Sequence, residues 1–232
     1  MITVNEIYKK FGKLTVLDGV SFSIETGGVY AILGPNGSGK TTMLKTILGL
    51  VLPEKGTVEI NGTSILSAWE YRKNIAYLPQ VPRFPENLTV RELVQMIADI
   101  RHTNGRSEEL IVRFGLSDFL GKQLGDLSGG TRQKVNIVLA FMFDASICIL
   151  DEPTAGLDPM SLIELKKLIE EEKEKGKIIL ITTHIMSLVE ELAQEIIFLL
   201  DGKIQFNGSI EVLKNQTNRS KIEEAIAALI KP

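Results

Sequence analysis

Residues 34–42 read Gly34-Pro35-Asn36-Gly37-Ser38-Gly39-Lys40-Thr41-Thr42, a glycine-rich run that fits the phosphate-binding pattern G-x-x-x-x-G-K-[ST]. The apolar run before it, 29–33, predicts a short buried strand, and the run after it, 43–50, predicts a helix. A strand, a glycine loop and a helix in this order point backbone N–H groups at one spot, which attracts phosphate. Lys40 can then reach the β- and γ-phosphates of a nucleotide, and the Thr41 hydroxyl can bind Mg²⁺. Every residue of the run is therefore predicted to contact a nucleotide.

Length and composition predict a water-soluble protein of one large domain, or of one domain with a small satellite. The chain has 232 residues, 44% of them hydrophobic, which is enough for a sizeable core. The net charge of −3 encodes no strong attraction to nucleic acid, so no nucleic-acid partner is expected. Cys148 is the single cysteine, which excludes an intrachain disulfide, and its apolar neighbours predict a buried side chain. No signal peptide and no apolar run of about 18 residues is apparent, so we expect a cytosolic protein.

The spacing of apolar residues predicts an α/β chain with a helical insertion. Short β-prone runs near the N-terminus predict an antiparallel β subdomain, and later buried runs predict a mainly parallel sheet that ends in a hairpin around Asp201-Gly202. The predicted strands are 2–4, 21–24, 29–33, 57–60, 75–78, 147–150, 177–182, 196–200 and 203–206. We predict a single domain over 1–232, which comprises a catalytic core with its β subdomain (1–85 and 128–215), a helical subdomain (86–127) and a C-terminal helical tail (216–232).

Capping patterns predict where several helices begin. Ser67-x-x-Glu70 and Thr89-x-x-Glu92 each predict a capping box at a helix N-terminus. Asp158-Pro159 pairs an N-cap residue with proline at the first helical position, and the acidic run 170–174 is predicted to be the solvated end of that helix. Apolar residues at 222, 225, 226 and 229 predict an amphipathic helix, from Lys221 to Lys231, that packs on the body of the domain.

Two acidic residues follow the apolar run 147–150. Asp151 would hold Mg²⁺, directly or through water, and Glu152 would polarise a water molecule for attack on a γ-phosphate. Taken alone, this acidic pair is as well explained by a solvated strand end. The presence of a phosphate-binding loop in the same chain favours the catalytic interpretation.

A second glycine turn, Leu127-Ser128-Gly129-Gly130, precedes an apolar-periodic helix. The exposed N–H groups at the start of such a helix predict a second anion site. Taken alone, this segment would be interpreted as an ordinary capped helix that begins with a glycine turn.

Together, these motifs resemble the nucleotide-binding domain of an ATP-binding cassette (ABC) transporter. Leu127-Ser128-Gly129-Gly130 resembles the signature motif of that family, with Thr131 where glutamine is commonest. Pro79-Gln80 is similar to its Q-loop, Ala155-Gly156-Leu157-Asp158 to its D-loop, and Thr183-His184 to its switch-histidine region. Phe11 takes the place of the usual adenine-stacking tyrosine, keeping the stacking face but not the hydroxyl. The resemblance runs through the whole chain and implies a P-loop NTPase core.

The resemblance also implies roles for single residues. His184 would contact the γ-phosphate and help to hold the attacking water, so Glu152, His184 and Lys40 form the implied catalytic set. Gln80 would sense Mg²⁺ and the γ-phosphate, and Thr41, Gln80 and Asp151 form the implied metal site. Two copies would meet head to tail, with each ATP held between the loop of one copy and the signature motif of the other. The residues implied to contact ATP are Phe11, Gly34, Pro35, Asn36, Gly37, Ser38, Gly39, Lys40, Thr41, Thr42, Gln80, Ser128, Gly129, Gly130 and Asp158.

The implied function is ATP hydrolysis that powers a membrane transporter. The chain would act as a homodimer, or as a heterodimer with a related subunit, bound to an integral membrane permease on the cytoplasmic face of the cell membrane. Its short length and the sequence around the signature resemble ATPases that pair with ABC-2-type permeases. The alternative is a soluble ABC-type ATPase that acts on a nucleic-acid, ribosomal or protein assembly. One cassette, no long heptad insertion and no basic tract favour the transporter interpretation.

Overall fold

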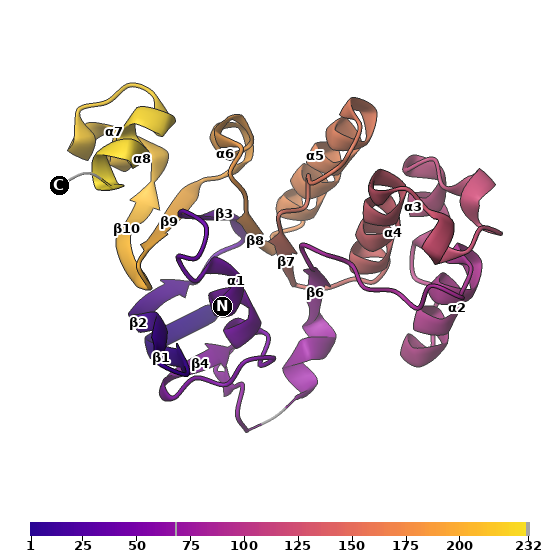
Figure 1. Ribbon diagram of the computed structural model, residues 1–232, viewed down its shortest axis with the longest axis horizontal. Helices are drawn as coiled ribbons and strands as arrows, with labels where there is room; N and C mark the ends of the chain where they lie inside the picture. Colours follow the sequence, from indigo (N-terminus) through magenta and orange to yellow (C-terminus); the bar gives the residue numbers. More distant parts are fainter. Residues whose placement is uncertain (68, 231–232) are drawn as a thin grey trace.

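The computed structural model describes residues 1–67 and 69–230, which form two sheets and eight α-helices (Figure 1). The central sheet has six strands in the order β10-β9-β3-β8-β7-β6, and the second sheet has four in the order β2-β1-β4-β5. Strands β3, β6, β7, β8 and β9 run parallel, and only the edge strand β10 is antiparallel. The central strands are β3 (Gly28–Leu33), β6 (Ile75–Leu78), β7 (Ile147–Asp151), β8 (Ile178–Thr182), β9 (Glu195–Leu200) and β10 (Lys203–Ser209). The predicted fold class, a mainly parallel core beside an antiparallel N-terminal sheet, is confirmed.

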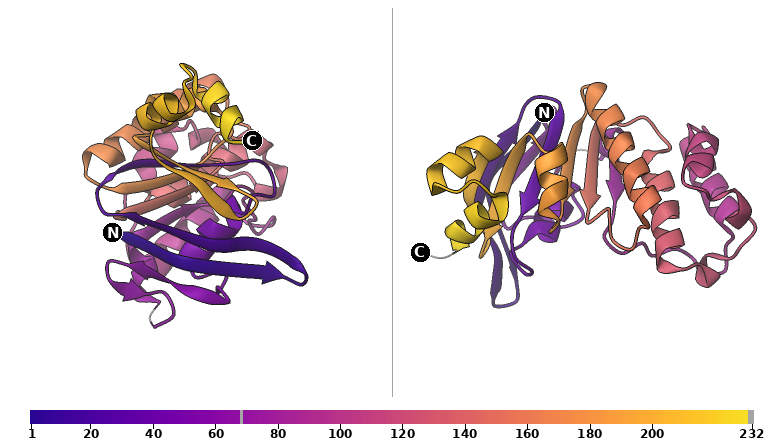
Figure 2. Two further views of the ribbon diagram at one scale, coloured as in Figure 1. Left: turned by 90° about the vertical axis from the view of Figure 1, so that its left-hand side faces the viewer. Right: turned by 90° about the horizontal axis from the view of Figure 1, so that it is seen from above.

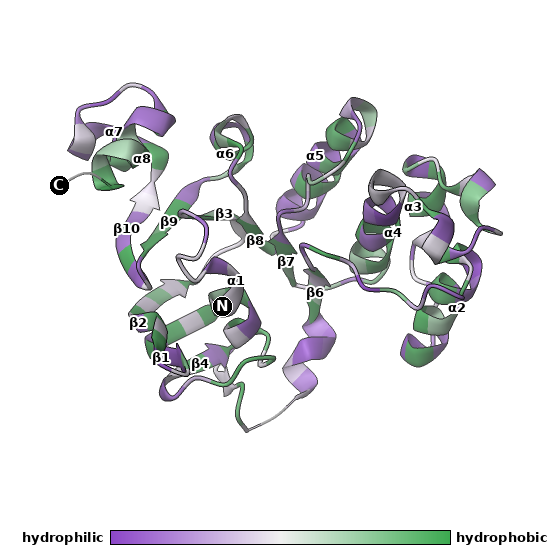
Figure 3. Ribbon diagram, viewed as in Figure 1, coloured by the Kyte–Doolittle hydropathy of each residue, from purple (hydrophilic) through white to green (hydrophobic). Residues whose placement is uncertain are grey.

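The central strands are apolar on both faces because each face is covered. Successive residues of β7 point to opposite sides, so Ile147 and Ile149 join one core while Cys148 and Leu150 join the other. Figure 3 shows this continuous hydrophobic run through β7 and β8. The burial predicted for Cys148 is confirmed, and it raises the pKa of the thiol to about 12.

The N-terminal sheet forms a separate layer, with helix α1 (Lys40–Ile47) between it and the central sheet (Figure 2). Buried residues of α1 such as Met43 and Leu44 belong to the core that both sheets share. The strands are β1 (Ile2–Phe11), β2 (Leu14–Ile24), β4 (Lys55–Ile60) and β5 (Thr63–Ser64). Strands β1 and β2 are longer than predicted. Bulges between them interrupt the alternation of apolar and polar residues by which a strand is recognised in a sequence.

Helix α1 begins and ends three residues earlier than the predicted helix at 43–50. It begins at Lys40 because the glycine loop turns directly into the helix, where Met43 N–H donates to Gly39 O at 2.8 Å. It ends at Ile47 because Gly49 adopts a left-handed φ of 65° and Leu50 N–H donates back to Lys45 O at 2.8 Å.

Helices make up most of the segment between β6 and β7. They are α2 (Val90–Arg101), α3 (Ser107–Arg113) and α4 (Gly129–Phe141), with short 3₁₀ turns at Ser117–Phe119 and Leu124–Asp126. The capping box predicted at Thr89 and Glu92 is confirmed, since each side chain bonds to the other residue's backbone N–H. Figure 1 places α2, α3 and α4 at the end of the molecule opposite to the C-terminal helices.

The capping box predicted at Ser67 and Glu70 is wrong. A 3₁₀ helix begins at Glu70 and runs to Asn74, and the Glu70 carboxylate accepts a hydrogen bond from Trp69 N–H at 3.1 Å. Ser67 is used elsewhere, because its hydroxyl donates to Ser64 O at 2.9 Å in the turn after β5. The intervening residue 68 lies outside the described residues.

Helix α5 (Pro159–Glu174) begins as predicted, with the Asp158 side chain accepting a hydrogen bond from Ser161 N–H at 2.8 Å. The prediction that the acidic end of this helix is solvated is wrong for Glu172, which is only 3% exposed. The Glu172 carboxylate pairs with Lys177 at 2.5 Å and with Arg106 at 2.8 Å. Burial alone would raise the pKa of Glu172, but hydrogen bonds and charge attraction from Lys175 and Lys177 hold this pKa below its usual value. One face of the last turns of α5 therefore packs against the chain, while Glu174 is exposed as predicted.

The C-terminal segment forms α6 (Met186–Leu192), α7 (Ile210–Thr217) and α8 (Ile222–Ile230). The predicted amphipathic tail is confirmed over the described residues, because Ile222, Ala225 and Ile226 are buried. Lys231 lies outside them. In the part of the chain that the structure describes, no helix is long and apolar enough to cross a membrane.

Candidate nucleotide-binding site

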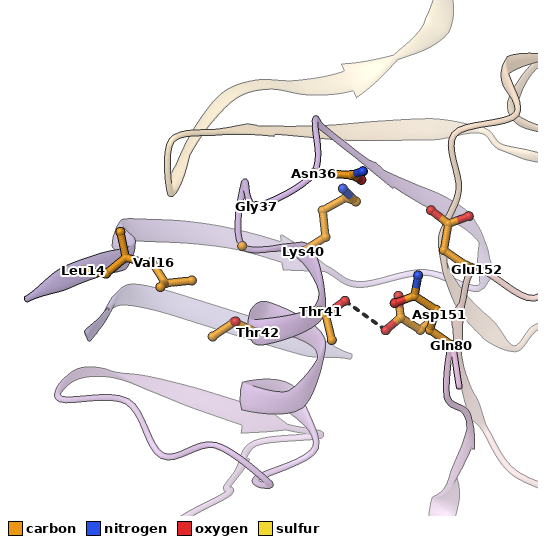
Figure 4. Close-up of a pocket in the computed structure, with 11 residues that line it drawn as sticks. Leu14, Val16, Asn36, Gly37, Lys40, Thr41, Thr42, Gln80, Asp151 and Glu152 are labelled. Atoms are coloured by element: carbon orange, nitrogen blue, oxygen red, sulfur yellow. Dashed lines mark hydrogen bonds between the residues drawn. The ribbon is translucent and has the colours of Figure 1, made fainter. Parts of the chain in front are cut away.

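Four neighbouring strands end at one edge of the central sheet and deliver the predicted site residues there. Strand β3 leads into the glycine loop, β6 into Pro79-Gln80, β7 into Asp151-Glu152 and β8 into the segment before His184. The carboxyl edge of a parallel sheet is where α/β proteins usually bind ligands. A cavity of about 440 Å³ lies at this edge (Figure 4), lined by Leu14, Val16, Asn36, Gly37, Gly39, Lys40, Thr41, Thr42, Gln80, Asp151 and Glu152.

The glycine loop is held against the sheet by close backbone contacts. A Cβ on Gly34 would lie 2.1 Å from Leu199 O, so only glycine fits there. Lys40 opens α1, and its Nζ donates to Gly34 O at 2.7 Å and to Pro35 O at 3.0 Å. Burial lowers the pKa of Lys40, and the nearby carboxylates of Glu152 and Asp151 oppose this shift. The loop thus combines a cation with the N-terminus of a helix, which suits phosphate.

Asp151 joins the loop to the end of β7. Its Oδ2 accepts a hydrogen bond from Thr41 Oγ1 at 3.1 Å, and its Oδ1 accepts one from Thr182 Oγ1 at 2.5 Å. Figure 4 shows Gln80 beside Asp151 at the same wall of the cavity. Among residues 1–67 and 69–230, no group of three His, Cys, Asp or Glu side chains gathers to hold a metal by itself. Mg²⁺ is commonly bound by one or two carboxylates together with phosphates and waters. The single carboxylate of Asp151, beside the hydroxyl of Thr41 and the amide oxygen of Gln80, fits that pattern.

Glu152 leaves the strand direction directly after Asp151. Its φ is 49°, in the left-handed region, and its backbone N–H is held by the Thr182 carbonyl at 3.1 Å and the Thr182 hydroxyl at 2.9 Å. Its carboxylate lies 3.0 Å from His184 Nδ1. The Glu152 side chain is 13% exposed and that of His184 is 81% exposed. The pair therefore joins a partly buried carboxylate in the cavity wall to a histidine at the surface.

The far end of the cavity contains residues that the sequence did not predict. Leu14 and Val16 of β2 line it, and neither was predicted as a site residue. Phe11, predicted to stack on a base, is 52% exposed and is not among the lining residues. Phe11 pairs with Leu14 across the β1–β2 hairpin. A prediction of this pairing would have placed Leu14 next to the residue expected to stack on the base. The described lining also omits Gly34, Pro35 and Ser38 of the loop.

The remaining predicted residues lie outside this cavity. Ser128 caps α4, where its Oγ accepts a hydrogen bond from Thr131 N–H at 3.2 Å, and its side chain is exposed. The two glycines differ in the space beside them. A Cβ atom added to Gly129 would meet open space, whereas a Cβ atom added to Gly130 would lie 2.6 Å from Gly156 O. Gly130 therefore permits close packing within the chain, and the exposed face of Gly129 is free for another molecule.

Asp158 is likewise absent from the lining of the cavity. Its carboxylate pairs with Lys134 of α4 at 2.7 Å and accepts the hydrogen bonds that cap α5. The ion pair with Lys134 and these hydrogen bonds hold the pKa of Asp158 well below its usual value. Of the predicted residues, one group lines the cavity, and a second group, Ser128, Gly129, Gly130 and Asp158, lies at the N-termini of α4 and α5. Phe11, Gly34, Pro35, Ser38 and His184 belong to neither group, although His184 contacts Glu152 at the cavity wall.

Comparison with known proteins identifies the family. The family model described as ABC transporter matches residues 17–155. A lantibiotic transport ATP-binding protein of Streptococcus pyogenes is 33% identical over 219 residues, which cover 90% of this chain and 93% of that protein.

Solved structures agree with this assignment. The ATP-binding subunit of an ABC transporter is similar with a TM-score of 0.92 and 31% identity, over 100% of both chains. A dimeric ATP-binding cassette in a post-hydrolysis state, bound to ADP and Pi, is similar with a TM-score of 0.81 and 26% identity, over 90% of this chain and 99% of that one. The chain belongs to the ABC transporter family and is one of its ATP-binding cassettes, an ATPase.

Proposed function

We propose that the cavity binds ATP together with Mg²⁺ and hydrolyses it. Lys40 and the N–H groups of the loop would hold the phosphates, and Thr41, Asp151 and Gln80 would hold the metal, which neutralises charge on the phosphates. Glu152 would orient and polarise the attacking water, with His184 holding its carboxylate and contacting the γ-phosphate. The arrangement at the ends of β3, β6, β7 and β8 supports these roles, because it gathers a cation, a metal-binding acid and a second acid around one cavity.

The proposed active unit is a dimer in which each ATP lies between two copies. The observation that carries this proposal is that Ser128 and Gly129 are exposed at a helix N-terminus outside their own cavity. A γ-phosphate bound to one copy would be met by this helix N-terminus from the other, where the partial positive charge of the helix attracts an anion. Hydrolysis would remove the shared phosphate and release the pair. The likeness to a dimeric cassette bound to ADP and Pi supports this arrangement.

The dimer proposal is tested by replacing Ser128 with arginine. The side chain is exposed, so the variant should fold and bind ATP as a monomer, while the added bulk and charge prevent the second copy from closing on the nucleotide. Its mass in solution with ATP should stay that of one chain. Ser128→Ala, which removes only the helix cap at a cost of about 1 kcal/mol, is the matched control and should still dimerise. Dimerisation of Ser128→Arg with ATP at the normal concentration would refute the facing-site arrangement.

We further propose that the dimer powers a separate membrane permease of the ABC-2 type, bound on the cytoplasmic face of the cell membrane. The related lantibiotic transport ATP-binding protein supports this assignment. A tagged copy expressed in the source cell should be recovered from membranes with one integral membrane protein in comparable amount. Specific retention on ribosomes or DNA in place of that protein would favour the alternative, an ATPase that acts on a soluble assembly.

A further inference from the structure

Helix α4 carries two amide side chains inside an otherwise apolar core. Gln133 and Asn136 are each 3% exposed, and their neighbours Val135, Ile137 and Val138 are fully buried. A buried amide costs free energy unless its hydrogen bonds are made, so apolar residues fill such positions better when only packing matters. The partners of these two amides therefore show what they contribute.

Both amides bond to backbone carbonyls in loops that line the nucleotide cavity. Asn136 Nδ2 donates to Pro79 O at 2.9 Å and to Gln133 Oε1 at 3.3 Å. Gln133 Nε2 donates to Pro153 O at 2.9 Å. Pro79 directly precedes Gln80, and Pro153 directly follows Glu152. One connected pair of side chains thus holds the two loops that carry the proposed metal ligand and the proposed water-activating acid.

Pro79 lies one residue beyond the end of β6, so the ladder of the sheet does not fix its position. Because proline has no N–H, its carbonyl is the only backbone group through which this residue can be held by a hydrogen bond. Asn136 supplies the donor from helix α4. The N-cap of the same helix, Ser128, lies about 12 Å away at the rise of an α-helix. Helix α4 therefore joins the cavity of its own chain to the surface proposed to meet the second copy.

We propose that Asn136 is a positioning residue for Gln80: through the Pro79 carbonyl it holds the Gln80 side chain at the metal-binding wall of the cavity. This inference rests on the proposed function, because it concerns the role of Gln80 toward Mg²⁺ in that site. Asn136 touches neither nucleotide nor metal in this account. It keeps the loop at Gln80 in its binding conformation before MgATP arrives. Without it, part of the binding free energy would be spent on ordering the loop, and the affinity for MgATP would fall.

The test compares Asn136→Ala with the matched variant Val138→Ala, which lies on the same helix, is equally buried and makes no polar contact with the loops. Calorimetry measures the affinity for a non-hydrolysable ATP analogue in Mg²⁺ and in EDTA. For Asn136→Ala, the gain in affinity from Mg²⁺ should fall by about three- to tenfold, the size expected for one lost hydrogen bond, while the affinity in EDTA stays unchanged. Val138→Ala should lower the melting temperature without changing this gain.

A second measurement needs no ligand. In the free protein, hydrogen exchange of β6 (Ile75–Leu78), which is hydrogen-bonded to β7 and ends next to Pro79, should become faster in Asn136→Ala and stay unchanged in Val138→Ala, because only the first variant releases Pro79. If Asn136→Ala does not fold, Asn136→Ser, which removes less volume but is too short to reach Pro79 O, is measured in its place. Normal exchange together with a normal gain from Mg²⁺ in a folded Asn136 variant would overturn the proposal.

The Gln80→Ala background separates this inference from the proposed function. If Gln80→Ala alone leaves the gain from Mg²⁺ unchanged, the proposed role of Gln80 fails. If Gln80→Ala reduces the gain and Asn136→Ala does not, the role of Gln80 stands and that of Asn136 fails. The account expects Asn136→Ala to have no further effect once Gln80 is removed. Two independent, multiplying losses would show that Asn136 acts by another route.

Discussion

Replacement of Glu152 by glutamine is expected to slow ATP hydrolysis by about 10²- to 10⁴-fold, the usual contribution of a general base, while ATP still binds. Glutamine keeps the shape of the side chain in the cavity wall but cannot take a proton from water. The bond to His184 would persist with its donor and acceptor rearranged, so the geometry at 3.0 Å need not change. Because hydrolysis releases the proposed pair, the variant should also accumulate as a dimer with ATP.

Single-turnover hydrolysis of bound ATP measures the change in rate directly. The mass of the variant in solution with ATP shows whether the dimer accumulates. Glu174→Gln is the matched control, because Glu174 lies exposed at the far end of α5 and its loss should leave the rate unchanged. A normal rate for Glu152→Gln would show that another group activates the water.

Replacement of Lys40 by alanine is expected to abolish tight binding of MgATP. The ammonium group stands at the head of α1, where the loop carbonyls of Gly34 and Pro35 and the nearby carboxylates of Glu152 and Asp151 face it. Hydrogen bonds to charged groups contribute about 1.5–3 kcal/mol each, so loss of contacts to two phosphates should weaken binding by about 10²-fold or more. Lys45→Ala removes the same charge from the exposed side of the same helix and should bind ATP normally.

A fluorescence titration with labelled ATP checks both lysine variants, and the melting temperature shows whether each is folded. Unchanged affinity in Lys40→Ala would contradict the phosphate role of this residue and, with it, the assignment of the cavity.

The parts of the site that the sequence predicted are local in the chain. The loop 34–42, the acids after β7 and the cap at Asp158 each depend on residues within a few positions, so their patterns are visible without the fold. The parallel sheet then brings them together, because neighbouring strands end at the same edge.

The parts that were missed depend on contacts between distant segments. Glu172 looks solvated in an acidic run, and its burial depends on Arg106, 66 residues away, and on Lys177, just before strand β8. Leu14 enters the cavity only because the β1–β2 hairpin folds over the loop. The amides of Gln133 and Asn136 follow the helical pattern of a core, and only the structure shows that they bond to the loops at Pro79 and Pro153.

The central claim is that the loop at 34–42 is one half of a site whose other half comes from a second copy. Sedimentation of a mixture of Lys40→Ala and Ser128→Arg, each also carrying Glu152→Gln, tests it most directly. Either variant alone has no intact site and should stay monomeric with ATP. The mixed pair has one intact site, made by the loop of the Ser128→Arg copy and the signature of the Lys40→Ala copy, so ATP should produce a dimer that contains both. A mixture that stays monomeric, or a dimer formed by either variant alone, would contradict the account.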